Sequence, residues 1–296
     1  MKLTMIALLL MPGILSPAAA APETAPTPDS GETSAVVMFW NLENFFEPGD
    51  TAASPYWTAR RFRAKCNGIA KTILEAADHA GKLPDAIGFA EVGNAVVLRR
   101  LINGTILGKT DYRIVHYDSP DRRGIDCALL YRSTRLSLRS SSAEHLRGPD
   151  GETVATRDIL VCVFDSLALL VNHHPSKLGS GAADRRAAAM SLMRHLGDSL
   201  AAEGIPSLCV GDFNDTLWGK DLPGTIKYNG VWEKIDGGFG FGGLQFRDEA
   251  FCSPSLLVPD RSHGGLKPRR TFNGPKYTGG ISDHLPVIYY IYTLKN

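Results

Sequence analysis

The sequence predicts a mixed α/β (α+β) fold, a four-layer sandwich in which two mixed β-sheets pack face to face with helices outside. Short apolar runs of strand length alternate with longer stretches whose apolar residues recur at helical spacing. Two neighbouring apolar runs are joined by only Asp165-Ser166, the pattern of an antiparallel hairpin. A hairpin within an otherwise alternating chain of strands and helices indicates mixed sheets rather than purely parallel ones.

Seven apolar runs are bounded by polar, Gly or Pro residues. We expect strands over residues 35–40, 86–90, 127–131, 159–164, 167–171, 207–210 and 286–292. Three longer stretches predict helices over residues 62–79, 95–104 and 182–203. The Gly-rich region 223–270 shows no clear periodicity, and we expect long loops there.

The N-terminal residues 1–20 have the pattern of a secretory signal peptide. Lys2 precedes a short apolar run, and small residues at 16–20 form a cleavage region. Pro12 and Gly13 interrupt the apolar run, which is too short for a membrane-spanning helix. Residues 21–34 are rich in Pro, Thr and Ser and predict a flexible leader. We therefore expect a single folded domain over residues 35–296, in a secreted or periplasmic monomer without integral membrane association.

The balanced charge argues against a processive or nonspecific DNA binder, and the cysteines indicate a structural role. A formal net charge of +1 provides no general attraction to polyanions, although a local patch could still bind phosphates of a nucleic acid substrate. The five cysteines are an odd set, so at least one is unpaired within a monomer. Cys127, Cys162 and Cys209 lie within apolar runs and predict a structural role.

Polar clusters follow several expected strands, where reactive side chains are commonly placed. Asn41 and Glu43 alternate after the first strand, so both can face one side, and their oxygens suit a hard cation such as Mg²⁺. Glu91 follows the second strand, where a carboxylate needs a metal or an arginine as partner. Arg123 lies in a charged turn and can clamp phosphate oxygens. An ordinary polar strand end and a solvated charged turn are the alternatives.

Two later strands also end in polar residues. His173 and His174 follow an aliphatic run and precede a Pro turn, and a histidine there can bind phosphate or donate a proton. Asp212 and Asn214 alternate in Gly211-Asp212-Phe213-Asn214, which places a potential base beside a potential oxyanion donor. An Asx turn is the alternative for the second motif.

The last motif, Ser282-Asp283-His284-Leu285-Pro286, stands directly before the final expected strand. Asp283 can bind a metal, and His284 can contact the substrate or activate a water molecule.

In this order, the motifs resemble the endonuclease/exonuclease/phosphatase superfamily, whose members include type I deoxyribonucleases. The matching elements span nearly the whole chain after the leader: Trp40-Asn41-Leu42-Glu43, Glu91, the histidine pair, Gly211-Asp212-Phe213-Asn214 and Ser282-Asp283-His284-Leu285-Pro286. Pro175-Ser176-Lys177 and Arg270-Thr271-Phe272 are similar to a secreted bacterial branch of this superfamily.

The resemblance implies a divalent metal, Mg²⁺ or Mn²⁺. Asn41 and Glu91 take the positions of metal-binding residues in this family. Glu43 stands where some members carry a second acidic ligand, and Asp283 matches the terminal acid.

The resemblance also implies catalytic roles. Asp212 corresponds to the residue that orients or deprotonates the attacking water, and Asn214 to the amide that steadies the phosphorane oxygens. His284 matches an imidazole that lies close to the scissile phosphate. His173 follows a small polar residue, as the family's other histidine does. Asp236 matches the acid that partners a histidine, although Gly237-Gly238 departs from the usual continuation of that strand.

Arg123 and, as the alternative to His173, His174 would then contact the substrate phosphate. The expected function is that of a secreted divalent-metal-dependent phosphoesterase, which hydrolyses a phosphodiester or phosphomonoester through in-line attack of an activated water. A nuclease acting on DNA or RNA is one alternative, and a non-catalytic binding module on the same fold is another.

Overall fold

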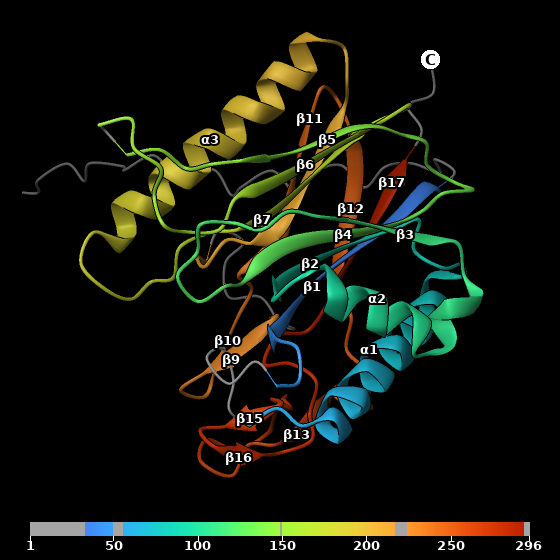
Figure 1. The fold of residues 1–296 in the computed structure, drawn as a ribbon, viewed down its shortest axis with the longest axis vertical. Coiled ribbons are helices and arrows are strands. Elements are labelled where there is room, and N and C mark those ends of the chain that lie inside the picture. The colour runs from blue at the N-terminus through green and yellow to red at the C-terminus, as the bar shows by residue number, and fades with distance from the viewer. Residues whose placement is uncertain (1–32, 50–55, 149, 217–223, 293–296) are drawn as a thin grey trace, which may run out of the picture. The chain divides into compact units, whose positions relative to one another are not determined.

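A computed structural model of the chain describes residues 33–49, 56–148, 150–216 and 224–292 (Figure 1). The expected signal peptide, 1–20, and the leader up to residue 32 lie outside the described residues. The first strand, β1, begins at Thr33, two residues before the expected start of the domain at Ala35.

Two mixed β-sheets form the centre of the fold, as the sequence predicted. The first has the strand order β12-β17-β1-β2-β4-β3, and the second has the order β11-β8-β7-β6-β5. The pairs β1–β2 and β7–β8 are parallel, whereas the other neighbours in these sheets are antiparallel. Their bounds are β1 Thr33–Phe45, β2 Ala86–Val92, β3 Tyr112–His116, β4 Asp126–Arg132, β5 Leu138–Glu144, β6 Ile159–Phe164, β7 Ala168–His173, β8 Ser207–Asp212, β11 Asp236–Phe241, β12 Gln245–Ala250 and β17 Val287–Tyr292.

Helices cover the outer faces of both sheets (Figure 1). Helices α1 (Ala59–Ala80) and α2 (Ala95–Asn103) pack on the first sheet, and α3 (Ala182–Ala202) packs on the second. The Thr58 side chain caps α1 by accepting a hydrogen bond from the Arg61 amide, and Asn94 caps α2 in the same way.

Three apolar clusters correspond to the three interfaces between the four layers. One cluster lies between the first sheet and helices α1 and α2 and includes Trp40 and Ile69. A second lies between the sheets and includes Phe39 and Leu169. The third lies between the second sheet and α3 and includes Met193 and Phe213. The strand residues alternate between clusters because successive side chains point to opposite faces.

The expectation of long loops over residues 223–270 was wrong. This region contains β11 and β12 and four short strands: β9 Ile226–Tyr228, β10 Val231–Glu233, β13 Leu257–Pro259 and β14 Leu266–Pro268. Phe239 and Phe241 in β11 pack against the α3 cluster. The many glycines made these strands hard to predict, because glycine within a strand usually weakens it. Here several of the glycines lie where neighbouring groups approach the backbone closely.

The remaining described elements are short. They are the 3₁₀ helices Ile106–Lys109 and Pro254–Leu256 and the strands β15 Phe272–Asn273 and β16 Lys276–Tyr277. Within the described ranges, no helix combines the length and the apolar character needed to cross a membrane.

All five cysteines are free, and Cys127, Cys162 and Cys209 are buried in the sheets as expected. Burial raises the pKa of each of these three thiols, which favours the neutral, unreactive form.

Candidate active site

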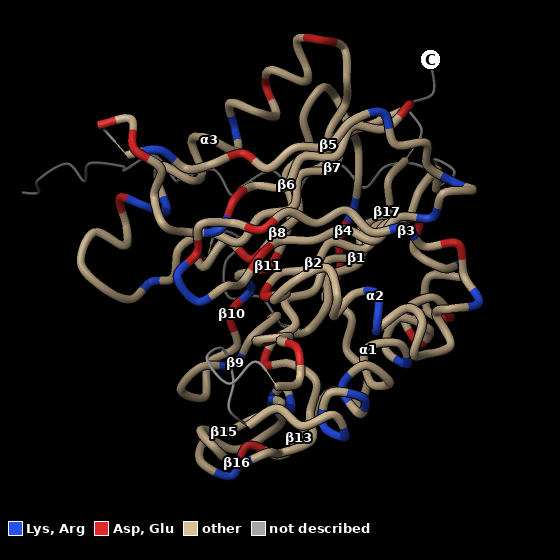
Figure 2. The backbone as a smooth tube through the Cα atoms, in the orientation of Figure 1, with Lys and Arg blue, Asp and Glu red and all other residues tan. Residues whose placement is uncertain are grey.

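The candidate active site lies where strands of both sheets end. Acidic positions gather around the ends of β8, β10 and β11 in Figure 2. Asp212, the last residue of β8, is the register partner of His173 on β7 and of Asp236 on β11. These three residues therefore lie side by side across adjacent strands. In the first sheet, Asn41 of β1 pairs with Ala90 of β2, immediately before Glu91.

The first sheet is irregular at this edge. The β1–β2 register breaks between Asn41 and Phe45, and Glu43, Asn44 and Glu91 have positive φ angles of 48°, 51° and 61°. Left-handed backbone is unfavourable for such residues and concentrates at functional sites. The Asn44 amide donates a hydrogen bond of 2.7 Å to the Glu91 carboxylate, which holds the two irregular segments together.

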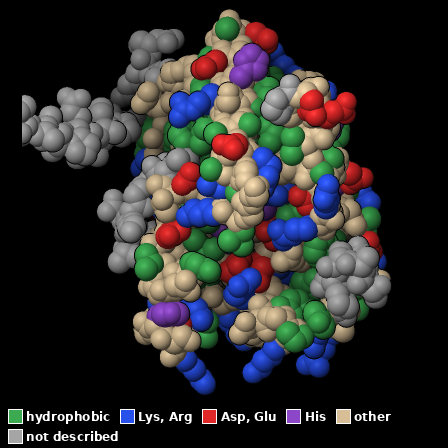
Figure 3. Space-filling view, turned by 90° about the vertical axis from the view of Figure 1, so that its left-hand side faces the viewer, with side chains coloured by type: hydrophobic (Ala, Val, Ile, Leu, Met, Phe, Trp, Pro, Cys, Tyr) green, Lys and Arg blue, Asp and Glu red, His purple; other side chains and the backbone are tan. Residues whose placement is uncertain are grey.

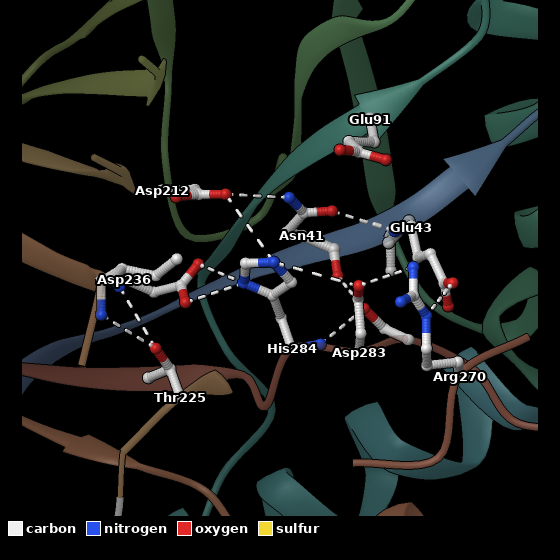
Figure 4. A network of polar contacts seen from close by, with 12 residues as sticks. Asn41, Glu43, Glu91, Asp212, Thr225, Asp236, Arg270, Asp283 and His284 are labelled. Carbon is white, nitrogen blue, oxygen red and sulfur yellow. Dashed lines mark hydrogen bonds and ion pairs between the residues drawn. The ribbon is translucent and has the colours of Figure 1, made fainter. Parts of the chain in front are cut away.

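Asp212 is the buried centre of the site (Figure 4). Its two carboxylate oxygens accept hydrogen bonds from Asn41 Nδ2 at 3.0 Å and from the Asn214 amide at 2.9 Å. The Nε2 atoms of His173 and His284 lie 3.7 Å and 3.8 Å from Asp212 Oδ2. Both distances are longer than a hydrogen bond. The two imidazoles therefore face the Asp212 carboxylate without forming a hydrogen bond to it.

His284 is held by a separate set of contacts. Its Nδ1 lies 2.9 Å and 3.2 Å from the two carboxylate oxygens of Asp236. Trp40 Nε1 donates to the His284 carbonyl at 2.9 Å, and the Thr225 hydroxyl accepts from the Asp236 amide at 3.2 Å. The structure thus places Asp236 against a histidine, as the resemblance implied, and directs His284 Nε2 toward Asp212 (Figure 4).

Burial and neighbouring charges change the protonation of these groups. Burial, followed by the charge of Asp236, raises the pKa of Asp212 to about 7. Burial alone would lower the pKa of His284, but Asp236 and Asp212 outweigh it and raise that pKa well above its ordinary value. Burial, followed by the charges of Arg157 and Arg123, lowers the pKa of His173 well below its ordinary value. At neutral pH, His284 is therefore charged and His173 is neutral.

The other residues expected to bind metal lie on the side of Asn41 that faces away from Asp212 (Figure 4). Glu43 accepts from Arg270 Nε at 3.0 Å and from the Thr271 amide at 2.8 Å. Asp283 lies 3.1 Å from Arg270 Nη2, so this guanidinium joins the two carboxylates. Burial, followed by the charge of Asp283, raises the pKa of Glu43.

This donor set fits a hard divalent cation. Glu43, Glu91, Asp283 and Asn41 offer carboxylate and amide oxygens, the ligands that Mg²⁺ and Mn²⁺ prefer. Arg270 already pairs with both Glu43 and Asp283, so a cation at this position would share these carboxylates with the guanidinium. Among the described residues, two groups have ligand atoms that all lie within 4.8 Å of one another: Asp212, Asp236 and His284, and His116, Asp118 and Asp126. Glu43, Glu91 and Asp283 are spread more widely, whereas the hydrogen bonds of the Asp212 group already orient it for acid–base chemistry.

The structure brings only some of the residues expected to contact phosphate into the site. Arg123 reaches the site: its Nη2 donates to Asn44 Oδ1 at 2.7 Å and lies 3.4 Å from Glu91. The His174 ring instead packs edge-on against Phe213, with centroids 4.8 Å apart. Of the two histidines, His173 is therefore the one beside Asp212. The Asn214 side chain also turns aside from the Asp212 carboxylate and donates to the His174 carbonyl at 3.0 Å.

The structure adds two residues that the sequence analysis did not place in the site. Arg270 was predicted only as part of the motif Arg270-Thr271-Phe272, and Lys65 was not among the candidate residues. The Lys65 ammonium is buried and donates to the carbonyls of Leu42 and Glu43 and to Thr271 Oγ1. One signal could have identified it: Lys65 falls on the apolar stripe of α1 together with Phe62 and Ile69, where a charge needs buried partners.

Fold and site define a class: a sandwich of two mixed sheets with a buried Asp–His centre and an adjacent group of carboxylates. A family model described as "Endonuclease/Exonuclease/phosphatase family" matches residues 36–236. The chain therefore belongs to the endonuclease/exonuclease/phosphatase family, whose members are phosphoester hydrolases. No curated protein matches the chain by sequence.

Several solved structures share the fold. A mannosyl-6-phosphatase from Bacteroides thetaiotaomicron is 15% identical, with a TM-score of 0.56 over 88% of this chain and 100% of that one. The catalytic domain of human Nocturnin, solved with a sulfate anion, is 16% identical, with a TM-score of 0.56 over 87% of this chain and 93% of that one. Truncated TDP2 from Caenorhabditis elegans is 16% identical, with a TM-score of 0.51 over 88% and 98% of the two chains.

Proposed function

We propose that this chain is a secreted or periplasmic, divalent-metal-dependent phosphoesterase that hydrolyses a phosphate ester by in-line attack of an activated water. Membership of a family of phosphoester hydrolases supports the general chemistry. The arrangement of side chains around Asp212 supports the mechanism, and the signal-peptide pattern of residues 1–20 supports export.

The observation that carries the mechanism is the environment of Asp212. Asn41 and the Asn214 amide fix the orientation of its carboxylate, and a pKa of about 7 suits a base that works near neutral pH. Asp212 accepts a proton from the water as the water oxygen bonds to phosphorus. The bond from phosphorus to the alcohol oxygen breaks, and this oxygen keeps the electron pair and takes a proton from solvent.

Charge on the phosphate oxygens needs donors aimed at it before the reaction begins. The charged His284 supplies an Nε2–H, whose direction is set by Asp236. His173 supplies a neutral imidazole on the other side of Asp212. A divalent cation held by Glu91, Glu43, Asp283 and Asn41 would neutralise further charge on a phosphate oxygen.

The Asp212→Asn variant tests this function. The amide keeps the size of the side chain but cannot accept the proton, so we expect turnover to fall about 100- to 10,000-fold. The measurement is metal-supported hydrolysis of p-nitrophenyl phosphate and bis(p-nitrophenyl) phosphate, together with DNA and RNA, each with and without chelator. Asp165→Asn, at an exposed hairpin, is the matched control and should retain full activity. Unchanged turnover in a folded Asp212→Asn protein would exclude the proposed role of Asp212.

Export is tested separately. Expression of the full chain in a Gram-negative host should release a protein into the periplasm whose N-terminal sequence begins after the small residues at 16–20. A cytoplasmic protein that retains Lys2 would contradict export and would leave the hydrolase proposal intact.

A further inference from the structure

Two arginines flank the irregular segment formed by Glu43 and Asn44, and this pair points to a class of substrate. We propose that Arg123 and Arg270 together bind the terminal, dianionic phosphate of a phosphomonoester, so that the enzyme prefers monoesters to diesters. The inference rests on the proposed function and specifies its substrate. On the face turned to the viewer in Figure 3, acidic side chains gather near the centre, with Lys and Arg side chains around them.

Arg123 is held in place by the loop between β3 and β4. Its backbone amide donates to Asp121 Oδ1 at 2.9 Å, and Asp121 also pairs with Arg157 at 3.2 Å. The loop is closed where Asp126 accepts from the Ser119 amide at 2.8 Å. The guanidinium is anchored on Asn44 and Glu91 through Nη2 alone. Within the described residues, its Nε and Nη1 groups have no partner, and its side chain is 52% exposed.

Arg270 is held by different elements. Its Nε and Nη2 contact Glu43 and Asp283, and its carbonyl accepts from the Gly280 amide at 3.1 Å and from the Thr278 hydroxyl. A Cβ on Gly280 would collide with the backbone of Arg269 and Arg270, so only glycine allows this close approach. Within the described residues, Nη1 of Arg270 has no partner, and its side chain is 53% exposed.

The two guanidinium groups are thus anchored on consecutive residues of β1, Glu43 and Asn44. Within the described residues, N–H groups remain without a partner on both arginines, Nε and Nη1 on Arg123 and Nη1 on Arg270, and a charged guanidinium donates strong hydrogen bonds to phosphate oxygens. Within the described residues, Asp212 takes its hydrogen bonds from Asn41 and the Asn214 amide, and neither arginine contacts it.

Charge and the number of terminal oxygens distinguish the substrates. A phosphodiester has two nonbridging oxygens and one negative charge. A phosphomonoester has three such oxygens and a charge near −2 at neutral pH, with strong affinity for arginine. The third oxygen and the second charge make a monoester a stronger ligand than a diester for the two guanidinium groups.

The test compares two substrates in four variants. Arg270→Gln and Arg123→Gln should each lower kcat/KM for p-nitrophenyl phosphate about 10- to 100-fold, the loss expected for a charge-assisted contact. Activity toward bis(p-nitrophenyl) phosphate should fall less, so that the ratio of kcat/KM for the monoester to kcat/KM for the diester drops about tenfold in each variant. Arg270→Lys keeps the charge, but one ammonium cannot bridge Glu43 and Asp283 and also donate to phosphate as the guanidinium can, so this variant should behave like Arg270→Gln. The neighbouring Arg269, which donates to the Thr278 carbonyl, provides the control Arg269→Gln, with no change expected.

A binding measurement separates this inference from the hydrolase proposal. Calorimetric titration of the metal-free protein with inorganic phosphate, in chelator, should show Kd raised about tenfold or more in Arg123→Gln and Arg270→Gln and unchanged in Arg269→Gln. Equal losses on both esters, full activity of Arg270→Lys or unchanged phosphate binding would each overturn the phosphate-binding role. If the wild type cleaves neither ester in the presence of metal, the proposed function fails, whereas the calorimetry still decides whether the arginines bind phosphate.

Discussion

Lys65 is a buried ammonium beneath the irregular end of β1, and removing it tests how this segment is held. It donates to two β1 carbonyls and to Thr271, and burial lowers its pKa to about 8, against the charges of Glu43 and Glu91. Lys65→Met leaves those acceptors buried without a donor. We expect a loss of about 2–4 kcal/mol in the free energy of unfolding, measured by urea denaturation.

The matched control for Lys65 is Lys71 on the same helix. Lys71 pairs with Glu75 on the surface, so Lys71→Met should change the stability by less than about 0.5 kcal/mol. A Lys65→Met protein as stable as the control would show that the β1 carbonyls do not depend on this ammonium.

His174 makes the folded chain sensitive to acid. Burial, followed by the charges of Arg157 and Arg186, lowers the pKa of its imidazole to about 3. The unfolded chain takes up this proton below about pH 6.5, whereas the folded chain does not. The contribution of the neutral ring to stability is therefore complete above about pH 6.5 and is lost as the pH falls toward 3, at up to about 1.4 kcal/mol per pH unit.

Replacing His174 with glutamine removes this dependence. Urea denaturation between pH 7 and pH 4 should give a shallower decline in stability for His174→Gln than for the wild type. The exposed His195 on α3 provides the control, since His195→Gln should keep the wild-type slope. Parallel pH profiles for the wild type and His174→Gln would contradict the buried neutral state of this ring.

At the residue scale, the sequence identified groups that follow strands directly. Asp212, Asn41 and Glu91 stand out because a polar residue after an apolar run is locally visible. Arg270 is not visible in this way, because its importance comes from contacts with Glu43, 227 residues earlier in the chain. Only the folded chain shows which of many surface arginines meets a pair of carboxylates.

At the scale of elements, β11 depends on Gly238, which departs from the usual continuation of this strand in the family. A Cβ on Gly238 would lie 2.7 Å from Tyr289 Cε1 of the facing sheet and 3.0 Å from the Cys209 carbonyl oxygen. Gly238→Ala should therefore cost about 1–3 kcal/mol of stability, as overpacking does in other cores. Because Asp236 begins the same strand, the Asp236–His284 pair should shift and activity should fall.

A double-mutant cycle tests the cause of this effect. Tyr289→Leu removes the ring that occupies the space over Gly238, so the double variant should be more stable than the sum of the single losses by about 0.5–3 kcal/mol. Strict additivity in thermal or urea unfolding would show that the clash with Tyr289 is not the source of the loss.

Elements with a strong periodic signal were predicted, and elements with a polar or Gly-rich sequence were not. The seven expected strands and three expected helices all occur. Strand β5 was missed because it lies at a sheet edge, and its sequence Leu-Arg-Ser-Ser-Ser-Ala-Glu carries no apolar run. Strand β11 was missed because Gly237, Gly238 and Gly240 interrupt the pattern, which left only the resemblance to indicate Asp236.

At the scale of the whole molecule, the arrangement of two mixed sheets followed from one hairpin and a regular alternation of elements. These features restrict topology because parallel neighbours need a crossover, and a hairpin forces one antiparallel pair. The convergence of β1, β2, β7 and β8 at one edge follows from their parallel pairing within each sheet. How the two sheets face each other is set by side-chain packing among residues distant in sequence, which no local pattern reports.

The candidate metal ligands come from distant parts of the chain and meet only when it is folded, so a bound metal should stabilise the chain against global unfolding. Asn41 and Glu43 lie in β1, Glu91 lies in β2, and Asp283 precedes the last strand. A cation that binds only the folded chain stabilises it by about 2.7 kcal/mol at a hundredfold excess over Kd. For a domain of this size, that corresponds to a rise in Tm of roughly 5–10 °C, measured with Mg²⁺ or Mn²⁺ against chelator.

Glu91→Gln should lose most of this rise, whereas Glu75→Gln on the outer surface of α1 should keep it. A rise in Tm that persists in Glu91→Gln would place the metal elsewhere, and the absence of a rise in the wild type would show that the site holds no metal. Both outcomes are decisive because the carboxylates of β1 and β2 must act together to hold the cation.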